Sequence, residues 1–364
     1  MLECVILSQS GLTATPSRKY LIAMKAVFTG GGTLGHVIPA LSVAEELRKR
    51  ATDADIVYIG SQKENEREYV VSHGFEFIAI PAGKLRRYFS FENLVDIFRL
   101  LIGIVRAFFL IGRLRPDIVF SKGGYVSVPV VLAAALRGVP VITHESDISM
   151  GLANRINARF ARRICLGFDT VHGDERYVYT GNPVRRDLIE CMQTPDERPL
   201  LLILGGSLGA QSLNECIYAH LDELTERAYV VHQTGPTGRN IVHENYEHHE
   251  FIADELPSLI KRASLVISRA GANAISELRW AAVPMVLAPI RTNASRGDQI
   301  ENARFLEERG EALVGWNDEE LIEKAVRLLE DRSLSDRLRE NCRREASVPS
   351  TERIVDLIFK ELER

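Results

Sequence analysis

A glycine-rich segment near the start of the chain, TGGGTLGHVIPAL at residues 29–41, has the composition of a phosphate-binding turn. It follows a run typical of a strand and precedes one typical of a helix, and its G-x-G-x-x-G glycines are Gly30, Gly32 and Gly35. Glycines let a ligand approach the backbone, and the next helix start offers N–H groups and the positive dipole end to an anion. A dinucleotide site would also need an acid at the end of the second strand. The expected strand at 55–60 runs into Ser61 and Gln62, which disfavours NAD.

His36 directly follows the last of these glycines, at the start of the expected helix. A side chain at the carboxyl end of a strand faces the ligand crevice of a parallel sheet. The ordinary pKa of histidine suits general-base chemistry near neutral pH. We expect His36 to be the general base, and the alternative is a helix-capping or merely exposed histidine.

Three further polar turns follow apolar runs in the second half of the chain: GGSLGAQSLN at 205–214, SRAGANAISE at 268–277 and RTNASRGDQIEN at 291–302. Small residues before a helix again predict an anion site built from backbone amides. Ser207 could donate its hydroxyl to a phosphate, Glu277 could accept from ribose hydroxyls, and Gln299 and Asn302 could contact sugar hydroxyls. Each turn could instead be an ordinary strand-to-helix connection, and Glu277 a solvated acid.

Buried apolar strands alternate with helices twice along the chain, which predicts an α/β fold with two Rossmann-like, doubly wound parallel-sheet domains. The strands of the first half are expected at 25–30, 55–60, 75–80, 117–124 and 139–145, and those of the second at 198–207, 229–235, 264–271 and 284–290. Helices are expected from about Pro39 to Arg50, at 91–114 and from about Ala210. The predicted division is an extension outside the fold at 1–23, a first domain at 24–163, a connection at 164–196, a second domain at 197–348 and a terminal helix at 349–364.

Charge and cysteine content exclude several classes of protein. The chain of 364 residues has a net charge of −4, which excludes a bulk nucleic-acid binder. Its first half is basic and its second half acidic, which suggests different partners for the two domains. Five widely spaced cysteines without a C-x-x-C pair indicate a reducing compartment. Residues 1–23 do not resemble a signal peptide, and Met24 could be the true start.

A basic and aromatic segment at 83–115 is the membrane-facing candidate. Its longest apolar run, at 100–112, contains Arg106 and is too short to cross a bilayer. Apolar side chains interleaved with basic ones favour an anionic bilayer surface. The residues expected on that surface are Leu85, Arg86, Arg87, Tyr88, Phe89 and Phe91, whereas most apolar residues of the following helix are expected in the core.

Two groups of residues have the composition but not the context of a metal site. Asp53 and Asp55 form a D-x-D pair that precedes a strand instead of ending one. A second group, His243, Glu244, His248 and His249, lies in a charged segment without further ligands at a recognisable spacing. We expect both groups at the surface, with neither a metal nor another cofactor.

In their order along the chain, these motifs resemble the family of MurG, the N-acetylglucosaminyltransferase that converts lipid I to lipid II in peptidoglycan synthesis. The resemblance covers the chain from Met24 onward and rests on GGGTLGH, SKGGYVSVPV, THESD, GLANR, TGNPVR, GGSLGA, SRAGANAISE and DQIEN. It implies a GT-B fold, in which two Rossmann-like domains face one another across a cleft and the last helix returns to the first domain. It also implies a peripheral protein on the cytoplasmic face of the membrane. The sequence indicates no oligomeric state.

The resemblance implies that the second domain holds UDP-GlcNAc and the first a polyprenyl-linked acceptor. Arg185 would meet the donor's charge, Ile252 the uracil and Glu277 the ribose. The full set of implied contacts is Thr33, Leu34, Gly35, Asp147, Arg185, Ser207, Ile252, Ala272, Asn273, Ala274, Ile275, Ser276, Glu277 and Gln299.

The implied reaction is an inverting, metal-free transfer to the C4 hydroxyl of the acceptor, with Glu145 or Asp147 as orienting or alternative acids beside the base His36. The family often has GGTGGH where this chain has Leu34, and HEQN where it has His144, Glu145, Ser146 and Asp147. Asp147 therefore brings a carboxylate to a donor-contact position that is often an amide. The alternatives are a transferase for another glycolipid and a non-catalytic module that binds a nucleotide sugar.

Overall fold

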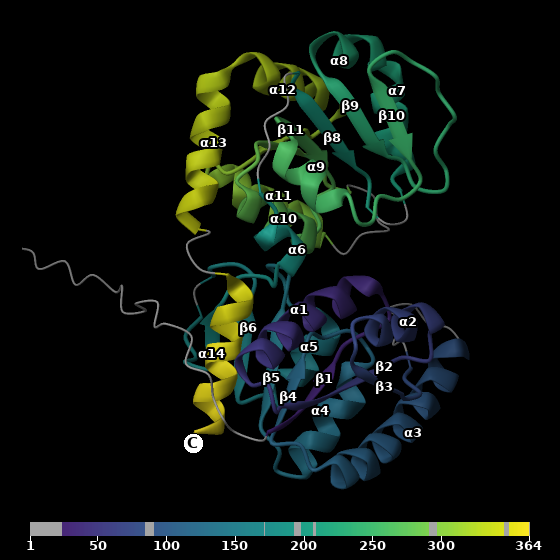
Figure 1. Cartoon of the computed structure of the whole chain (residues 1–364). Helices are drawn as coiled ribbons and strands as arrows, with labels where there is room; N and C mark the ends of the chain where they lie inside the picture. Colours follow the sequence, from purple (N-terminus) through teal and green to yellow (C-terminus); the bar gives the residue numbers. More distant parts are fainter. Residues whose placement is uncertain are drawn as a thin grey trace, which may run out of the picture.

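The computed structural model describes residues 24–83, 91–170, 172–192, 198–206, 209–290, 297–345 and 349–363. Two parallel sheets, each with its own helices, lie one above the other, with the short helix α6 (Arg186–Glu190) between them (Figure 1). The structure therefore has the two-sheet α/β architecture that the sequence predicts.

The first sheet has the strand order β3-β2-β1-β4-β5-β6-β7, with every pairing parallel. Its middle strands are apolar and buried because helices cover both faces. The order of the strands reverses between β1 and β4, which is where an open sheet of this kind binds ligands. Its elements are β1 (Lys25–Thr29), α1 (Leu34–Arg50), β2 (Asp55–Gly60), α2 (Glu64–Ser72), β3 (Glu76–Ala79), α3 (Phe91–Leu114), β4 (Ile118–Ser121), α4 (Ser127–Leu136), β5 (Val141–Glu145), α5 (Leu152–Asn157), β6 (Arg163–Leu166) and β7 (Tyr177–Tyr179).

The second sheet repeats this plan in the order β10-β9-β8-β11-β12-β13. All five residues of its central strand β8 are buried, and the order reverses between β8 and β11. Its elements are β8 (Leu200–Leu204), α7 (Gln211–Ala219), α8 (Leu221–Arg227), β9 (Tyr229–Gln233), β10 (Tyr246–His249), α9 (Leu256–Arg262), β11 (Leu265–Ser268), α10 (Ala272–Ala281), β12 (Met285–Leu287), α11 (Asp298–Glu308), β13 (Leu313–Val314), α12 (Asp318–Glu330) and α13 (Arg332–Glu345).

The first sheet extends further along the chain than the sequence predicts. β6 pairs with β5 and β7 pairs with β6, although most of β6 and all of β7 fall in the segment expected to connect the domains, 164–196. After the second domain, α14 (Ser350–Leu362) returns and packs Ile354, Ile358 and Phe359 into the core beneath α1. Glu361 of α14 forms an ion pair with Arg163 at 2.8 Å.

Some local predictions were wrong. α1 begins at Leu34 rather than near Pro39, so that Pro39 lies inside the helix, in its second turn. Two edge strands were not predicted: β10 is polar, and β13 has only two residues, so neither has the apolar pattern of a longer strand. The segment of His248 and His249 is therefore a strand, and the part of the chain that the structure describes contains no group of three side chains suited to a metal.

Most apolar residues of α3 were expected in the core. The structure contradicts this expectation, because one face of the helix is apolar and open to solvent. Its opposite face packs Ala107 and Ile111 into the core with α4. The exposed apolar residues, with 43–68% of their surface open, are Ile97, Phe98, Leu101, Ile102, Val105 and Phe109. Within the described residues no helix is long and apolar enough to cross a membrane. Leu85 to Phe89 lie outside the described residues, as does the side chain of Phe91.

Candidate functional site

The loops at the carboxyl ends of the two sheets face one another and form the candidate site. The side-chain amide of Asn273, in the first turn of α10, donates to the carbonyl oxygen of Gly35 at 2.8 Å. Gly35 is the last residue of the first glycine turn, so two segments more than 230 residues apart meet here. Thr33 directly precedes α1 without a capping hydrogen bond from its side chain, and Leu34 packs partly buried against the core of the first domain.

The first glycine turn is held by side chains from β2 and α2. Tyr58 donates its hydroxyl to the carbonyl of Gly30 at 3.0 Å. The fully buried carboxylate of Glu66 accepts from the N–H of Gly32 at 2.7 Å and from the hydroxyl of Ser61 at 2.7 Å. Gly32 has φ +96°, and a Cβ there would overlap the ring of Tyr125, so glycine is required. Glu66 was not predicted, because one acid in a charged helix start has no distinctive pattern.

His36 lies between this turn and the glycine pair that follows β4. Its backbone N–H donates to the carbonyl of Thr33 at 3.1 Å, within the first turn of α1. Its ring borders Gly124, where a Cβ would be 3.1 Å from the imidazole Cδ2, and Gly124 has φ +78°. The absence of a side chain at Gly124 therefore leaves room for the imidazole.

Glu145 is buried at the end of β5 and has four N–H partners. Its carboxylate accepts from the backbone of Ser146 at 2.9 Å, of Asp147 at 3.2 Å and of Gly151 at 3.0 Å, and from the side-chain amide of Asn154 at 3.0 Å. THESD and GLANR thus form one loop built around this carboxylate. These four hydrogen bonds engage Glu145 in holding the loop.

Asp147 lies where the first domain meets the second. The completely buried side-chain amide of Asn302, in α11, donates to the carboxylate of Asp147 at 3.0 Å and to the carbonyl of Ala270 at 3.1 Å. Its oxygen accepts from the N–H of Ile148 at 3.2 Å. Asn302 therefore joins the loop after β5 to the loop that precedes α10.

Two buried titratable side chains lie beneath this contact. Lys122, 1% exposed, donates from Nζ to the hydroxyl of Ser146. Burial lowers the pKa of Lys122 to about 8, against the opposing charges of Glu145 and Asp147. Burial, together with the charge of Lys122, holds the pKa of His144 well below its ordinary value, while its Nε2 donates to the carbonyl of Gly181 at 2.9 Å. His144 is therefore neutral at pH 7.

In the second domain, α10 begins at Ala272 after Gly271, without a side chain that caps its first N–H groups. Such a helix start is suited to an anion. The carboxylate of Glu277, in the second turn, accepts from Nε of Arg185 at 2.7 Å. Burial raises the pKa of Glu277, and the Arg185 guanidinium opposes that rise. Glu277, expected to contact the donor's ribose, and Arg185, expected to meet the donor's charge, are therefore paired with one another.

The remaining predicted contacts lie around this helix. Ile252 is buried, and its N–H donates to the side chain of Gln233 at 3.0 Å. The side chain of Gln299, at the start of α11, accepts from the N–H of Ile290 at 3.1 Å. Ala272, Ile275 and Ser276 are buried and Ala274 is partly exposed. Ser207 and residues 291–296 lie outside the described residues.

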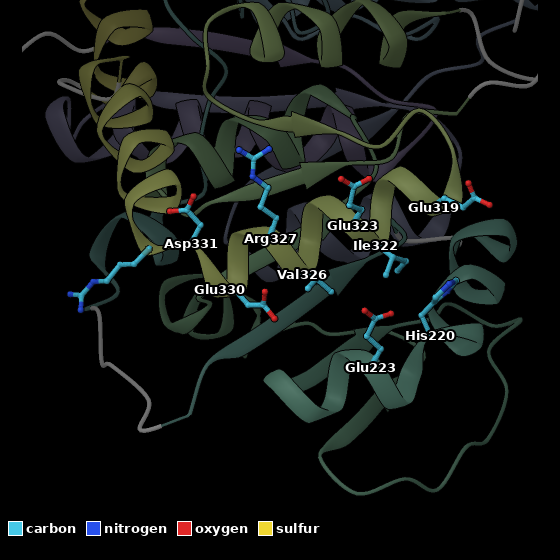
Figure 2. Close-up of a pocket in the computed structure, with 10 residues that line it drawn as sticks. His220, Glu223, Glu319, Ile322, Glu323, Val326, Arg327, Glu330 and Asp331 are labelled. Atoms are coloured by element: carbon cyan, nitrogen blue, oxygen red, sulfur yellow. The ribbon is translucent and has the colours of Figure 1, made fainter.

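Two hollows are lined by charged side chains, and Arg185 lies on the wall of the second. One of about 840 Å³ lies between α8 and α12, far from the first domain, and Figure 2 shows Arg327 and Glu330 on its wall pointing away from one another. Its wall carries mainly acids, which do not fit an anionic ligand. A cavity of about 550 Å³ opens between α1, α2 and α6, and the side chains of Arg48 and Arg185 on its wall are bonded within the protein.

Comparison with known proteins shows relatives along most of the chain. Residues 26–166 match the glycosyltransferase family 28 N-terminal domain, and residues 200–356 match the corresponding C-terminal domain. Two curated relatives are each named a UDP-N-acetylglucosamine–N-acetylmuramyl-(pentapeptide) pyrophosphoryl-undecaprenol N-acetylglucosamine transferase. One, from Clostridium botulinum (strain Langeland), is 43% identical over 83% of this chain and 88% of its own length. The other, from Treponema denticola, is 41% identical over 84% and 87%.

Among solved structures, MurG of Acinetobacter baumannii has a TM-score of 0.72 and 27% identity, with 93% of this chain and 99% of that chain covered. The calicheamicin glycosyltransferase CalG4 also has a TM-score of 0.72, at 17% identity over 94% of this chain and 98% of its own. At that identity the likeness shows the fold alone.

Replacing Lys122 with methionine tests the buried ammonium. The folded-state pKa of about 8 lies below the unfolded value of 10.5, so the unfolded chain binds more protons between these pH values. The stability that Lys122 contributes is complete above pH 10.5 and is lost as the pH falls through 8. We expect the free energy of unfolding of the wild type to rise relative to Lys122→Met between pH 8 and 10, by on the order of 2 kcal/mol. Urea titrations at several pH values measure this difference, and parallel pH profiles would contradict it.

Proposed function

The chain belongs to glycosyltransferase family 28 and, within it, to the MurG family, and from this we infer that it transfers N-acetylglucosamine from UDP-N-acetylglucosamine to undecaprenyl-pyrophosphoryl-N-acetylmuramoyl-pentapeptide (lipid I). The product is lipid II, the lipid-linked disaccharide of peptidoglycan synthesis. The observation that carries this inference is the 43% identity over 83% of the chain to a curated enzyme of that name.

We propose that the donor lies along the second domain, on the side that faces the first. Its diphosphate would bind at the uncapped start of α10 and at the glycine turn before α7, where N–H groups stabilise the charge of departing UDP. Ile252 would border the uracil. The sugar would lie between Gln299 and Asp147. The amide of Asn302 donates to the carboxylate of Asp147 at this place.

Arg185 is paired with Glu277, which supports a role in orienting that carboxylate rather than in direct contact with the donor's charge. Its Nε lies 2.7 Å from one carboxylate oxygen of Glu277, whereas its second nitrogen is 3.5 Å from the other oxygen. The close contact fixes the orientation of the carboxylate, and ribose hydroxyls can donate to it without displacing Arg185. Arg185 would therefore orient Glu277 and keep it ionised against the effect of burial.

For the chemical step we propose His36 as the general base. The acceptor oxygen forms a bond to the anomeric carbon as the bond from that carbon to the β-phosphate oxygen breaks. The hydroxyl proton passes to the imidazole, and UDP leaves with the electron pair. Glu145 serves as an orienting group rather than an alternative base, since four N–H donors engage its carboxylate. No step requires a metal ion.

A transfer assay with UDP-N-acetylglucosamine and a lipid I analogue, in the presence of EDTA, tests this function. We expect lipid II formation by the wild type, and a fall in kcat of roughly 10²–10⁴-fold in His36→Ala with little change in UDP affinity. The matched control is His220→Ala, at the hollow between α8 and α12, which should retain wild-type kcat. UDP-sugar binding without turnover by the wild type would contradict the enzyme assignment, and unchanged kcat in His36→Ala would exclude this base.

We further propose that the exposed apolar face of α3 rests on the inner face of the membrane that carries the acceptor. A helix that is apolar on both faces needs an apolar partner for its second face. Exposed arginines on the same helix, Arg99, Arg106 and Arg113, supply attraction to anionic lipid. The proposal adds this face of α3 to the predicted membrane segment 85–91, most of which lies outside the described residues.

Replacing Phe98 and Phe109 together with glutamate tests this surface. We expect the fraction bound to vesicles containing phosphatidylglycerol to fall at least roughly tenfold, because two apolar contacts are lost and two like charges are added. Both side chains are more than half exposed, so the melting temperature should not change. Val242→Glu, at a 96% exposed position of the other domain, is the control and should bind like the wild type. Equal binding by the double variant would contradict the proposal.

A further inference from the structure

Gln233 connects two segments of the second domain that the proposed function assigns to opposite ends of the nucleotide. It is the last residue of β9, and only 5% of its surface is exposed. Its side-chain amide donates from Nε2 to the carbonyl of Gly206, in the glycine turn before α7, at 3.1 Å. Its Oε1 accepts from the N–H of Ile252, in the loop after β10, at 3.0 Å. Neither the sequence motifs nor the proposed reaction gives Gln233 a role.

The two partners fix the direction of this amide. A backbone carbonyl only accepts and a backbone N–H only donates, so the nitrogen of Gln233 must face Gly206 and its oxygen must face Ile252. Both bonds satisfy polar atoms of a buried side chain, which favours this one conformation. The amide of Gln233 therefore holds the turn and the loop at a fixed separation.

The backbone on both sides of Gln233 is anchored to α7. The fully buried His232 donates from Nε2 to Oδ1 of Asn214, in α7, at 3.1 Å. Nδ2 of Asn214 in turn donates to the carbonyl of Thr234 at 2.8 Å. Side chains alternate along a strand, so His232 and Gln233 point to opposite faces of the sheet. The end of β9 is thus held from one face while Gln233 reaches the turn and the loop from the other.

Hydrogen bonds rather than packing define the position of Gly206. It has φ +88°, and apart from its neighbours in the chain no described atom lies within 4 Å of where a Cβ would stand. Its carbonyl oxygen accepts from the N–H of Gly209 at 3.0 Å as well as from Gln233. A carbonyl oxygen carries partial negative charge and would repel a diphosphate if it turned towards one. Gln233 therefore supplies one of the two donors that keep this oxygen engaged within the domain.

We propose that Gln233 is a positioning residue for the donor, which holds the glycine turn before α7 and the loop of Ile252 at the spacing that a nucleoside diphosphate requires. It also keeps the carbonyl of Gly206 turned away from the diphosphate. The proposal rests on the function proposed above, which assigns the diphosphate to this turn and the uracil to Ile252. Gln233 acts through these two backbone groups, so its loss should affect the donor and not the acceptor.

Gln233→Glu in the full-length protein tests this role, because it exchanges the amide for an acid of nearly the same shape. The ionised acid cannot donate to Gly206, whereas the protonated acid can donate there and still accept from Ile252. Burial raises the pKa of a carboxyl group, so protonation at pH 5 should restore both bonds. We expect the dissociation constant of UDP to exceed that of the wild type roughly tenfold at pH 8 and less than about threefold at pH 5. Calorimetric titration of both proteins at each pH gives this ratio, from which the ionisation of UDP itself cancels.

Gln233→Leu removes both hydrogen bonds at every pH and decides the question if Gln233→Glu does not fold. Its ratio to the wild type should stay near roughly tenfold at both pH values. In the transfer assay its KM for UDP-N-acetylglucosamine should rise by a similar factor, while the KM for the lipid I analogue stays within about twofold. A merely structural role predicts that the two KM values change together.

The matched control is Asn341→Asp, which makes the same exchange at another amide that donates to a glycine carbonyl. Asn341 donates to Gly310, in the turn after α11, at 2.8 Å. This variant should bind UDP like the wild type at both pH values. A ratio for Gln233→Glu that does not change with pH would overturn the proposal, as would equal changes of both KM values in Gln233→Leu. Wild-type protein that does not bind UDP would instead refute the proposed donor site, and the two failures are therefore distinguishable.

Discussion

The buried side chain of Asn302 is the contact on which the geometry of the site depends. One amide bonds to the carboxylate of Asp147, the N–H of Ile148 and the carbonyl of Ala270, and so joins loops from both sheets. A buried amide is costly when unsatisfied, so these bonds favour one relative placement of the domains. That placement also brings the amide of Asn273 to Gly35 and holds the start of α10 opposite the first glycine turn.

Charges around this contact are arranged so that each has a defined partner. Backbone N–H groups hold Glu145, the guanidinium of Arg185 holds Glu277, and Lys122 donates to the hydroxyl of Ser146, next to Asp147 in the chain. His144 remains neutral and bonds to Gly181, in the turn that follows β7. Fixed groups of this kind need little reorganisation when charge moves from the sugar to departing UDP, which is the main source of electrostatic catalysis. The site therefore combines this polar frame with His36, the residue that we propose as the general base.

Much of this arrangement could be predicted from the sequence, because apolar strands and glycine turns leave strong local patterns. The fold class, the span of α3 at 91–114 and the family followed from such patterns. The short strands β6, β7 and β10 did not, since pairing with a neighbouring strand rather than local composition makes them strands. Glu66 and Lys122 were missed for a related reason, because their importance comes from burial and from partners distant in the chain. The exposure of α3 could not be inferred either, as an apolar helix is most often buried on every face.

The central claim is that the start of α10 and the glycine turn before α7 bind a UDP-sugar where the two domains meet. A crystal structure of the protein with UDP-N-acetylglucosamine tests it most directly. The account predicts the diphosphate at the start of α10 and the turn before α7, the ribose on Glu277, and the sugar between Asp147 and Gln299. A nucleotide bound in the first glycine turn, at residues 30–35, with α10 unoccupied, would contradict it.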